Sequence, residues 1–261
     1  MTNFLLLGGT GKVGRRLAAV LREQGQDVRV ASRGAQGDVV FDWNDTATWA
    51  GALEGIDGVF VVGPGSATDW SPKLRDFEAA AAEAGVRKAV LLSARGVEFH
   101  PDGAVARAEQ TLRTGPLAWT ILRPTHFAQN FTEAMFVPDA DGEVRAPVGD
   151  ARHPFVDVQD IAEVAAAALT NAELDGKVID ISGPEAIPFA AAAQAVGGTY
   201  VPEARDAHVA ALRAAGTPEG YVTWRMAMLD GIARGDDAYI SHGVAETLGR
   251  PATPLHEALA D

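Results

Sequence analysis

The chain has 261 residues, enough to bury a substantial core in one large α/β domain with a small appended lobe. Its formal net charge of −13 would repel a nucleic-acid backbone, so we expect no nucleic-acid partner. It contains no cysteine, which excludes disulfides, thiolate metal sites and a cysteine nucleophile.

The first predicted element is an apolar strand at residues 3–7, which leads through a glycine-rich turn into a helix that begins near Lys12. The apolar run Phe4 to Leu7 is far too short for a signal peptide or a membrane span. We therefore expect a cytoplasmic protein with no membrane partner.

Three glycines in this turn, Gly8, Gly11 and Gly14, follow one another at a spacing of three. In a dinucleotide-binding turn such glycines let the main chain approach a pyrophosphate and let the helix pack closely on the sheet. The N–H groups and positive end of the helix then hold the phosphates. The alternative is a glycine-rich turn that binds nothing. The predicted cofactor contacts here are Gly8, Thr10, Gly11, Lys12, Val13 and Gly14.

A second strand at residues 27–32 completes a β-α-β unit, and its exit indicates which dinucleotide binds. An NAD site places a carboxylate there for the ribose hydroxyl, whereas an NADP site places an arginine for the 2′-phosphate. Ser32 and Arg33 hold this position, and Arg33 follows Gly14 by 19 residues. The pattern predicts NADP(H), with Arg33 as a solvated loop arginine the alternative.

The rest of the first two thirds alternates strands with helices, which predicts an α/β fold: a Rossmann-type doubly wound parallel sheet. The further predicted strands are Val39–Asp42, Gly58–Val62, Lys88–Ser93, Ala118–Arg123 and Lys177–Ser182. The intervening predicted helices are Trp49–Leu53, Leu74–Ala84 and Val105–Thr114.

Two segments depart from this alternation. Pro138–Pro154 reads as an irregular excursion, and a helix follows it with Asp157 and Asp160 at its N-terminal end. Beyond Gly183 the pattern becomes mainly helical. We predict a cofactor domain at residues 1–183, whose 124–154 excursion lines a cleft, and a small mainly helical C-terminal lobe at 184–261 on the substrate side. The helices expected in the lobe are Phe189–Val196, Asp206–Ala215 and Trp224–Gly235.

Four separated segments together resemble the NmrA-like group of atypical short-chain dehydrogenases/reductases. They are the glycine turn at residues 8–14, then 119–131, 156–162 and 181–185. The resemblance runs in order over most of the chain. It implies an NADP(H)-binding Rossmann domain with a substrate cleft between it and the C-terminal lobe.

The catalytic pair of typical short-chain dehydrogenases, a Tyr followed four residues later by a Lys, is missing. The tyrosines are Tyr200, Tyr221 and Tyr239, all in the C-terminal third, and none has a lysine four residues later. Some relatives carry a Lys or His about four residues before the position of Glu109, where this chain has Val105. Ordinary alcohol dehydrogenation is therefore not expected.

Further site residues are expected at the carboxyl ends of the central strands, where ligands bind in open α/β sheets. Ser93 is placed like a hydroxyl that binds a substrate carbonyl in relatives, although it could be a local cap. The near-neutral pKa expected for His126 suits a proton donor, and a role in shaping the pocket is the alternative. The resemblance places Asp42 near the adenine, with a solvated turn aspartate as the alternative. The additional cofactor contacts expected at these strand ends are Asp42, Trp43, Gly63, Pro64 and Pro124.

A substrate wall is expected from one segment of the cofactor domain and from the lobe, unless these side chains are plain core. Its expected members are Phe127, Asn130, Phe131, Trp224 and Met228. The six histidines lack metal-ligand spacing, so no metal site is predicted.

Three functions fit these features. The first is an NADPH-dependent reductase of a small conjugated or aromatic molecule, such as a quinone, enone, ketone or imine, that works as a monomer or homodimer. The second is a non-catalytic NADP(H) redox sensor read by a protein partner. The third is a redox-neutral isomerase or cyclase on the same fold.

Overall fold

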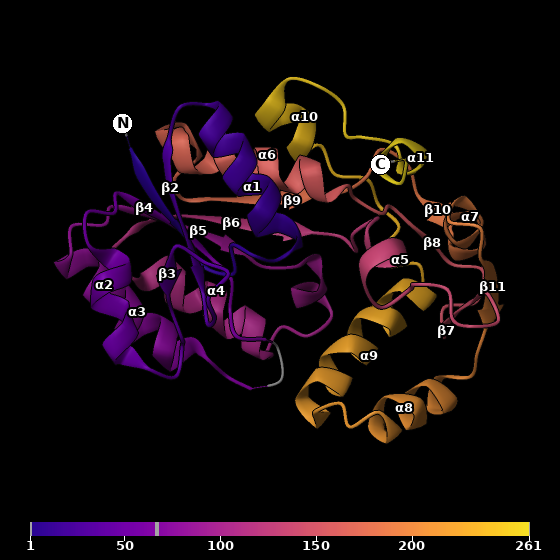
Figure 1. Cartoon of the computed structure of the whole chain (residues 1–261). Helices are drawn as coiled ribbons and strands as arrows, with labels where there is room; N and C mark the ends of the chain where they lie inside the picture. The colour runs from indigo at the N-terminus through magenta and orange to yellow at the C-terminus, as the bar shows by residue number, and fades with distance from the viewer. Residues whose placement is uncertain (1, 66–67, 261) are drawn as a thin grey trace.

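The computed structural model describes residues 2–65 and 68–260, and a seven-stranded parallel sheet lies at its centre (Figure 1). The strand order is β3-β2-β1-β4-β5-β6-β9, and every neighbouring pair is parallel. The order reverses between β1 and β4, which is where open α/β sheets bind ligands. The predicted Rossmann fold is confirmed. The strands of this sheet are β1 (Asn3–Leu6), β2 (Asp27–Ser32), β3 (Val39–Val40), β4 (Gly58–Val61), β5 (Lys88–Leu92), β6 (Ala118–Pro124) and β9 (Lys177–Ile181).

Helices cover both faces of the sheet, as the apolar run of β1 requires. Leu5 and Leu7 pack into the core on one face and Phe4 and Leu6 into the core on the other, because successive side chains of a strand point to opposite faces. The first face carries α2 (Trp49–Leu53), α3 (Ser71–Glu83) and α4 (Ala104–Thr114). The second carries α1 (Lys12–Glu23), α6 (Val158–Thr170) and α10 (Gly243–Leu248). Three short 3-10 helices join these elements: η1 (Thr46–Thr48), η2 (Arg95–Glu98) and η3 (Ala172–Leu174).

The lobe, which lies beside the sheet in Figure 1, has its own apolar core, to which both the excursion and the C-terminal third contribute. The chain after residue 183 is mainly helical, as expected, but it also contributes two short strands that the sequence did not predict. Two short sheets form, one from β8 and β10 and one from β7 and β11. Each of these strands is short and pairs with a strand far away in the chain. The local pattern of apolar residues therefore does not predict them. The elements of the lobe are α5 (Asn130–Glu133), β7 (Glu143–Ala146), β8 (Arg152–His153), β10 (Ile187–Pro188), α7 (Phe189–Ala195), β11 (Thr199–Pro202), α8 (Arg205–Ala214), α9 (Glu219–Ala233) and α11 (Leu255–Ala258).

Asp157 and Asp160 lie at the N-terminal end of α6, as predicted, and the Asp157 carboxylate caps the helix by accepting a hydrogen bond from the Gln159 N–H. Within the described ranges 2–65 and 68–260, no helix is both long and apolar enough to cross a membrane.

One buried carboxyl group on α3 should make the stability of the protein depend on pH. Glu78 on α3 is 1% exposed, neither carboxylate oxygen has a partner among the described residues, and burial raises its pKa to about 8. The folded state therefore binds a proton that the unfolded state releases above about pH 4.5, so stability falls as pH rises from there through about 8.

Glu78→Gln should remove this loss of stability at high pH. At pH 9 the variant should therefore unfold at a higher temperature than the parent, and its free energy of unfolding should be greater by roughly 2 kcal/mol. Thermal unfolding between pH 5 and 9 measures the effect. Glu83→Gln, an exposed position on the same helix, is the control and should change little. Parallel pH curves for the parent and Glu78→Gln would contradict the prediction.

Candidate cofactor and substrate site

The turn between β1 and α1 has the shape that a pyrophosphate needs. Gly8 has a φ of +67°, which favours glycine, and a Cβ on Gly14 would lie 2.4 Å from the Gly8 carbonyl oxygen. Gly11 is the N-cap of α1, and no side chain caps the helix there. The first amide groups of α1 thus lack a side-chain partner, and this turn fits a phosphate of the cofactor.

The segment around α5 lies beside the start of α1. Glu133 accepts hydrogen bonds from Arg15 at 2.6 Å and from Arg16 at 3.2 Å, while the Lys12 ammonium lies 3.5 Å from the Asn130 side-chain oxygen. Burial is the largest cause of a lowered pKa at Lys12, with smaller contributions from the neighbouring arginines. Lys12 therefore lies between the phosphate turn and the cleft, where it can contact both.

The exit of β2 offers a cation and no free carboxylate. Arg33 is exposed, and the Ser32 hydroxyl accepts a hydrogen bond from the Gly34 N–H at 3.2 Å. The nearest acidic residue along the chain, Asp38, accepts a hydrogen bond from the Val30 N–H at 2.8 Å. Its carboxylate is thus engaged by the main chain of β2.

Two of the expected cofactor contacts, Asp42 and Trp43, make hydrogen bonds within the protein near β3 and β4. The Asp42 carboxylate accepts a hydrogen bond from the Asn44 N–H at 2.8 Å, as a turn aspartate does. Trp43 is 7% exposed, packs edge-on against Phe41 and donates its indole N–H to the Val62 carbonyl. The structure thus places Trp43 in the first core, because five aromatic rings assemble there.

The strand exits after β4 and β6 hold the remaining expected cofactor contacts. At the exit of β4, Gly63 lies against the Trp70 side chain, and a Cβ there would be 2.4 Å from the indole. Pro64 follows it in the same loop. Pro124 ends β6 and lines the cavity described next.

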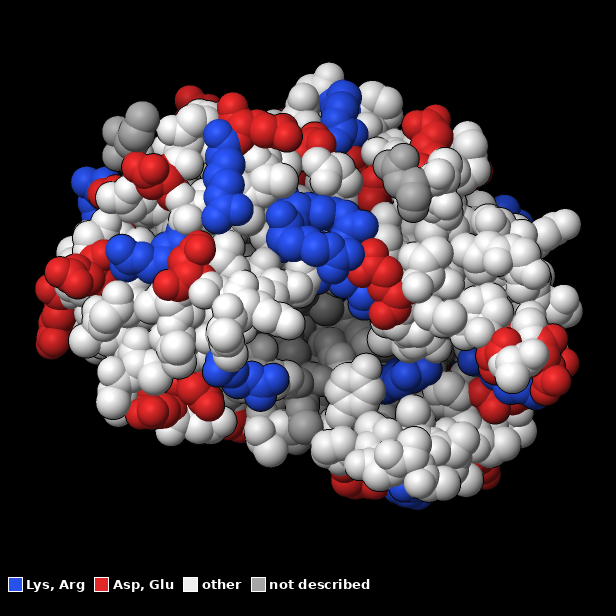
Figure 2. Space-filling view, in the orientation of Figure 1, with Lys and Arg blue, Asp and Glu red and all other residues white. Residues whose placement is uncertain are grey.

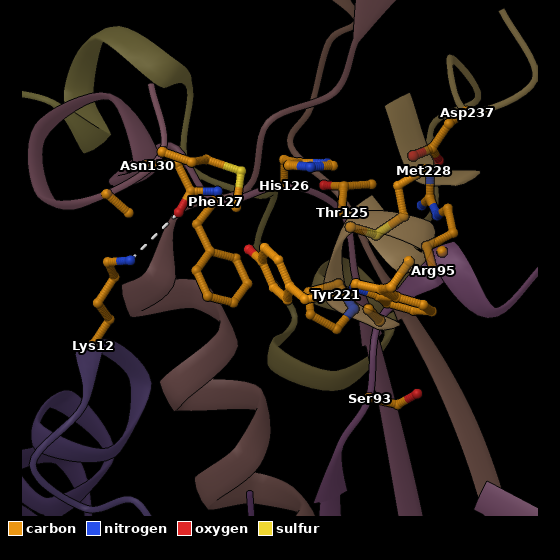
Figure 3. A pocket seen from close by; sticks show the side chains of 16 residues that line it. Lys12, Ser93, Arg95, Thr125, His126, Phe127, Asn130, Tyr221, Met228 and Asp237 are labelled. Carbon is orange, nitrogen blue, oxygen red and sulfur yellow. Dashed lines mark hydrogen bonds and ion pairs between the residues drawn. The ribbon is translucent and has the colours of Figure 1, made fainter. Parts of the chain in front are cut away.

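A cavity of about 410 Å³ lies between the carboxyl ends of β5 and β6 and helix α9 of the lobe (Figure 3). Figure 2 shows the molecule hollowed at the middle of this face, with basic side chains along one rim. Eight predicted site residues line the cavity: Lys12, Ser93, Pro124, His126, Phe127, Asn130, Trp224 and Met228. Eight further lining residues were not predicted: Ala94, Arg95, Gly96, Thr125, Ala134, Met135, Tyr221 and Asp237.

Phe131 does not line this cavity. It is fully buried in the apolar core of the lobe, where its ring packs against Phe136 and Phe155. Of the two expected phenylalanines, Phe127 lines the cleft and Phe131 packs into the lobe.

Ser93 was expected to donate a hydrogen bond to a substrate carbonyl, but its proton is already donated to another side chain. The Ser93 hydroxyl donates to Glu109 at 2.6 Å, and Glu109 also binds the Arg123 guanidinium at 2.9 and 2.6 Å. Since a hydroxyl has one proton, Ser93 offers the cavity only an acceptor while this contact persists. The sequence did not indicate this hydrogen bond, because Glu109 lies on α4 whereas Ser93 follows β5.

The near-neutral pKa expected for His126 was wrong. The side chain is 9% exposed, and burial together with the nearby Arg225 lowers its pKa to about 4. Its Nε2 atom has no hydrogen-bond partner among the described residues. His126 is therefore a neutral imidazole at pH 7, which can make a hydrogen bond in the cavity but does not hold a second proton.

A buried polar network that the sequence did not indicate lies behind His126. The His126 main-chain N–H donates to Nε2 of His153 at 3.1 Å, and Nδ1 of His153 faces Asp237 at 3.5 Å. Asp237 also pairs with the Arg95 guanidinium at 3.2 Å. Burial, with smaller contributions from His126 and Arg95, lowers the pKa of His153 well below its usual range, and burial raises the pKa of Asp237 to about 6.

Three members of this network, His126, His153 and Asp237, bring one possible metal-ligand atom each within 4.8 Å of the others. The Arg95 cation on Asp237 opposes a bound metal cation. The residues are far apart in the sequence, so no ligand spacing could reveal the grouping.

Comparison with known proteins agrees with this geometry. A family model described as NAD(P)H-binding matches residues 8–172. An uncharacterized oxidoreductase of Bacillus subtilis, YesF, is 31% identical over 267 residues, covering 97% of this chain and 92% of that protein. An NAD(P)H azoreductase of Xenophilus azovorans is 29% identical over 280 residues, covering 97% of this chain and 95% of the relative.

Among solved structures, an NADPH-dependent quinone oxidoreductase of Escherichia coli superposes with a TM-score of 0.80 at 21% identity, covering 99% of each chain. At this identity the likeness concerns the fold. The matched family model contains the glycine turn, the exit of β2 and the carboxyl ends of β5 and β6. The chain therefore belongs to the NAD(P)H-binding family, together with the oxidoreductases to which it is related.

Proposed function

We propose that the protein is an NADPH-dependent reductase of a small conjugated or aromatic molecule. The observation that carries the proposal is the continuity of the cavity: it extends from Lys12 at the phosphate turn to the aromatic side chains of the lobe. A dinucleotide bound at the turn would place its nicotinamide toward the ends of β5 and β6, beside those side chains.

The cavity wall suits a flat apolar substrate. Phe127 contributes from the cofactor domain, while Trp224, Met228 and Met135 contribute from the lobe and the excursion. Flat aromatic and flexible sulfur-containing side chains bind planar rings well. The azoreductase of X. azovorans, whose name describes reduction of a conjugated nitrogen double bond, adds support for this substrate class.

When bound, NADPH supplies the hydride, and the side chains of this cavity position the acceptor and exclude water. Neutral His126 can hydrogen-bond a substrate oxygen or nitrogen, and Asn130 lies where it can hold the carboxamide end of the cofactor or a substrate group. Glu109 binds both Ser93 and Arg123. These hydrogen bonds hold the end of β5 against α4 and thereby shape the floor of the cleft.

Cofactor preference provides the first test, because Arg33 should grip the 2′-phosphate that only NADP(H) carries. Arg33→Ala should raise the Kd for NADPH about tenfold or more and leave that for NADH unchanged. Calorimetric titration with both nucleotides measures this. Arg213→Ala, an exposed arginine in the lobe, is the control. Equal losses for NADPH and NADH would overturn the assignment of Arg33.

Turnover provides the second test. The purified protein should consume NADPH with 1,4-naphthoquinone or an azo dye as acceptor, followed by the loss of nicotinamide absorbance. Tight NADPH binding without consumption of NADPH by any such acceptor would contradict the reductase proposal.

A further inference from the structure

The reduction proposed above needs a proton as well as a hydride, and the cavity holds few groups able to supply one. Three hydroxyl side chains line it: Ser93, Thr125 and Tyr221. Ser93 donates its proton to Glu109 at 2.6 Å, and Thr125 donates to the Pro154 carbonyl at 2.6 Å. Both protons thus already have internal acceptors.

Tyr221 differs from the other two. No hydrogen bond from its phenol to an acceptor is formed within residues 2–65 and 68–260. Its side chain is half-buried and extends from the first turn of α9 into the cavity, with the hydroxyl pointing toward Phe127 (Figure 3). The phenol is therefore free to donate to a molecule that occupies the cavity.

The other ionisable groups of the cavity are less suited to this role. His126 is neutral at pH 7 because burial lowers its pKa to about 4. The Asp237 carboxylate is held by Arg95 at 3.2 Å, on the far side of the network. Lys12 lies at the phosphate turn beside Asn130.

We propose that Tyr221 is the proton donor of the reduction, supplied from the C-terminal lobe in place of the absent Tyr-Lys pair. This inference rests on the proposed function. With a quinone as substrate, the acceptor gains a hydride from NADPH and the phenolic proton of Tyr221, giving the hydroquinone and NADP⁺. The Tyr221 phenolate then recovers a proton from water.

Arg225, one turn further along α9, supports the role. It is 8% exposed, and its guanidinium is near enough to Tyr221 that the phenol offsets part of the lowering of the Arg225 pKa by burial. A buried cation beside the phenol stabilises the negative charge that proton donation leaves on the oxygen. The pairing is local, since residues four apart lie on one face of a helix.

Tyr221→Phe removes only the hydroxyl and tests the assignment. With 1,4-naphthoquinone, kcat should fall about 100-fold, within the range that general acid catalysis contributes. The Kd for NADPH, measured by calorimetry, and the KM for the quinone should stay close to those of the parent. Tyr200→Phe is the matched control, because that hydroxyl donates to the Ala146 carbonyl inside the lobe, and it should keep the parent kcat.

A second acceptor separates proton donation from a packing role. Malachite green, a triarylmethyl cation, becomes its neutral product by gaining hydride alone. If the parent reduces this dye, Tyr221→Phe should reduce it at nearly the parent rate while losing quinone reduction. An equal fall with both acceptors would overturn the inference, as would quinone reduction by Tyr221→Phe at the parent rate.

These results also separate the inference from the function on which it rests. If the parent reduces the quinone and Tyr221→Phe reduces it equally fast, only the role of Tyr221 falls. If the parent consumes NADPH with neither acceptor, the reductase proposal falls and the proton-donor role falls with it.

Discussion

Gly14→Ala should weaken NADPH binding by about 100-fold and lower the stability of the protein by about 1–3 kcal/mol. The added Cβ would lie 2.4 Å from the Gly8 carbonyl oxygen and 2.5 Å from the Gly9 Cα. These are backbone atoms of the turn that we expect to face the pyrophosphate, so no flexible side chain can move aside. Either the turn opens or α1 shifts away from the sheet, and both changes misplace the amide groups that hold the phosphates.

Calorimetric titration with NADPH and thermal unfolding measure the two effects of Gly14→Ala. Gly51→Ala is a matched control, because this glycine also lies inside a helix, α2, but a Cβ there meets no atom within 4 Å. Alanine has the higher helix propensity, so Gly51→Ala should leave NADPH affinity unchanged and preserve or slightly raise stability. Unchanged NADPH affinity in Gly14→Ala would mean that the turn is not the phosphate site.

Arg95→Met should destabilise the protein by about 3–5 kcal/mol, because it leaves the buried Asp237 carboxylate without its cation. The Arg95 side chain is fully buried, pairs with Asp237 at 3.2 Å and donates to the Tyr239 carbonyl at 3.0 Å. Its guanidinium also lies 4.0 Å from the centre of the Tyr239 ring. One side chain thus joins the end of β5 to the chain that follows α9.

The loss in Arg95→Met should be greater at pH 8 than at pH 5. Burial already raises the pKa of Asp237 to about 6, and removing Arg95 takes away the interaction that opposes this rise. A raised folded-state pKa means that stability falls as pH rises through that pKa, because the carboxylate must then ionise in a buried site. Denaturant unfolding at both pH values measures the difference.

Two further variants make this prediction specific to the buried pair. The double variant Arg95→Met, Asp237→Leu should recover part of the lost stability, since it removes the unpaired charge. Arg234→Met breaks an exposed pair with Asp236 and should cost less than about 1 kcal/mol. A loss in Arg95→Met no larger than that in Arg234→Met would show that the pair contributes little.

The architecture and the glycine-rich turn could be predicted from the sequence, because both depend on residues that are close together along the chain. The continuous apolar run of β1 predicts a strand that is buried on both faces, and the glycine spacing predicts the turn and the start of α1. The other strands of the seven-stranded sheet, and the helices between them, follow from similar local patterns. The short strands β7, β8, β10 and β11 were missed, because their pairing partners lie far away in the chain.

The candidate site was only partly accessible. Strand ends indicate where a ligand binds, so Ser93, His126 and Phe127 were found, and they do line one cavity. Phe131 and Trp43 were predicted as site residues by similar reasoning, yet both lie in apolar cores. Whether an aromatic side chain faces a core or a cleft depends on the packing of whole elements, which periodicity does not specify.

The sequence by itself determined the Rossmann sheet, the phosphate turn and the cation at the exit of β2, because each depends on residues that are neighbours along the chain. Only the tertiary structure decided which polar groups can act in the cavity. Burial keeps His126 neutral, Glu109 takes the proton of Ser93, and α9 brings Tyr221 to the ends of β5 and β6. Protonation and hydrogen bonding depend on the solvent exposure and charge around a group, and these arise from residues that folding brings together from distant parts of the chain.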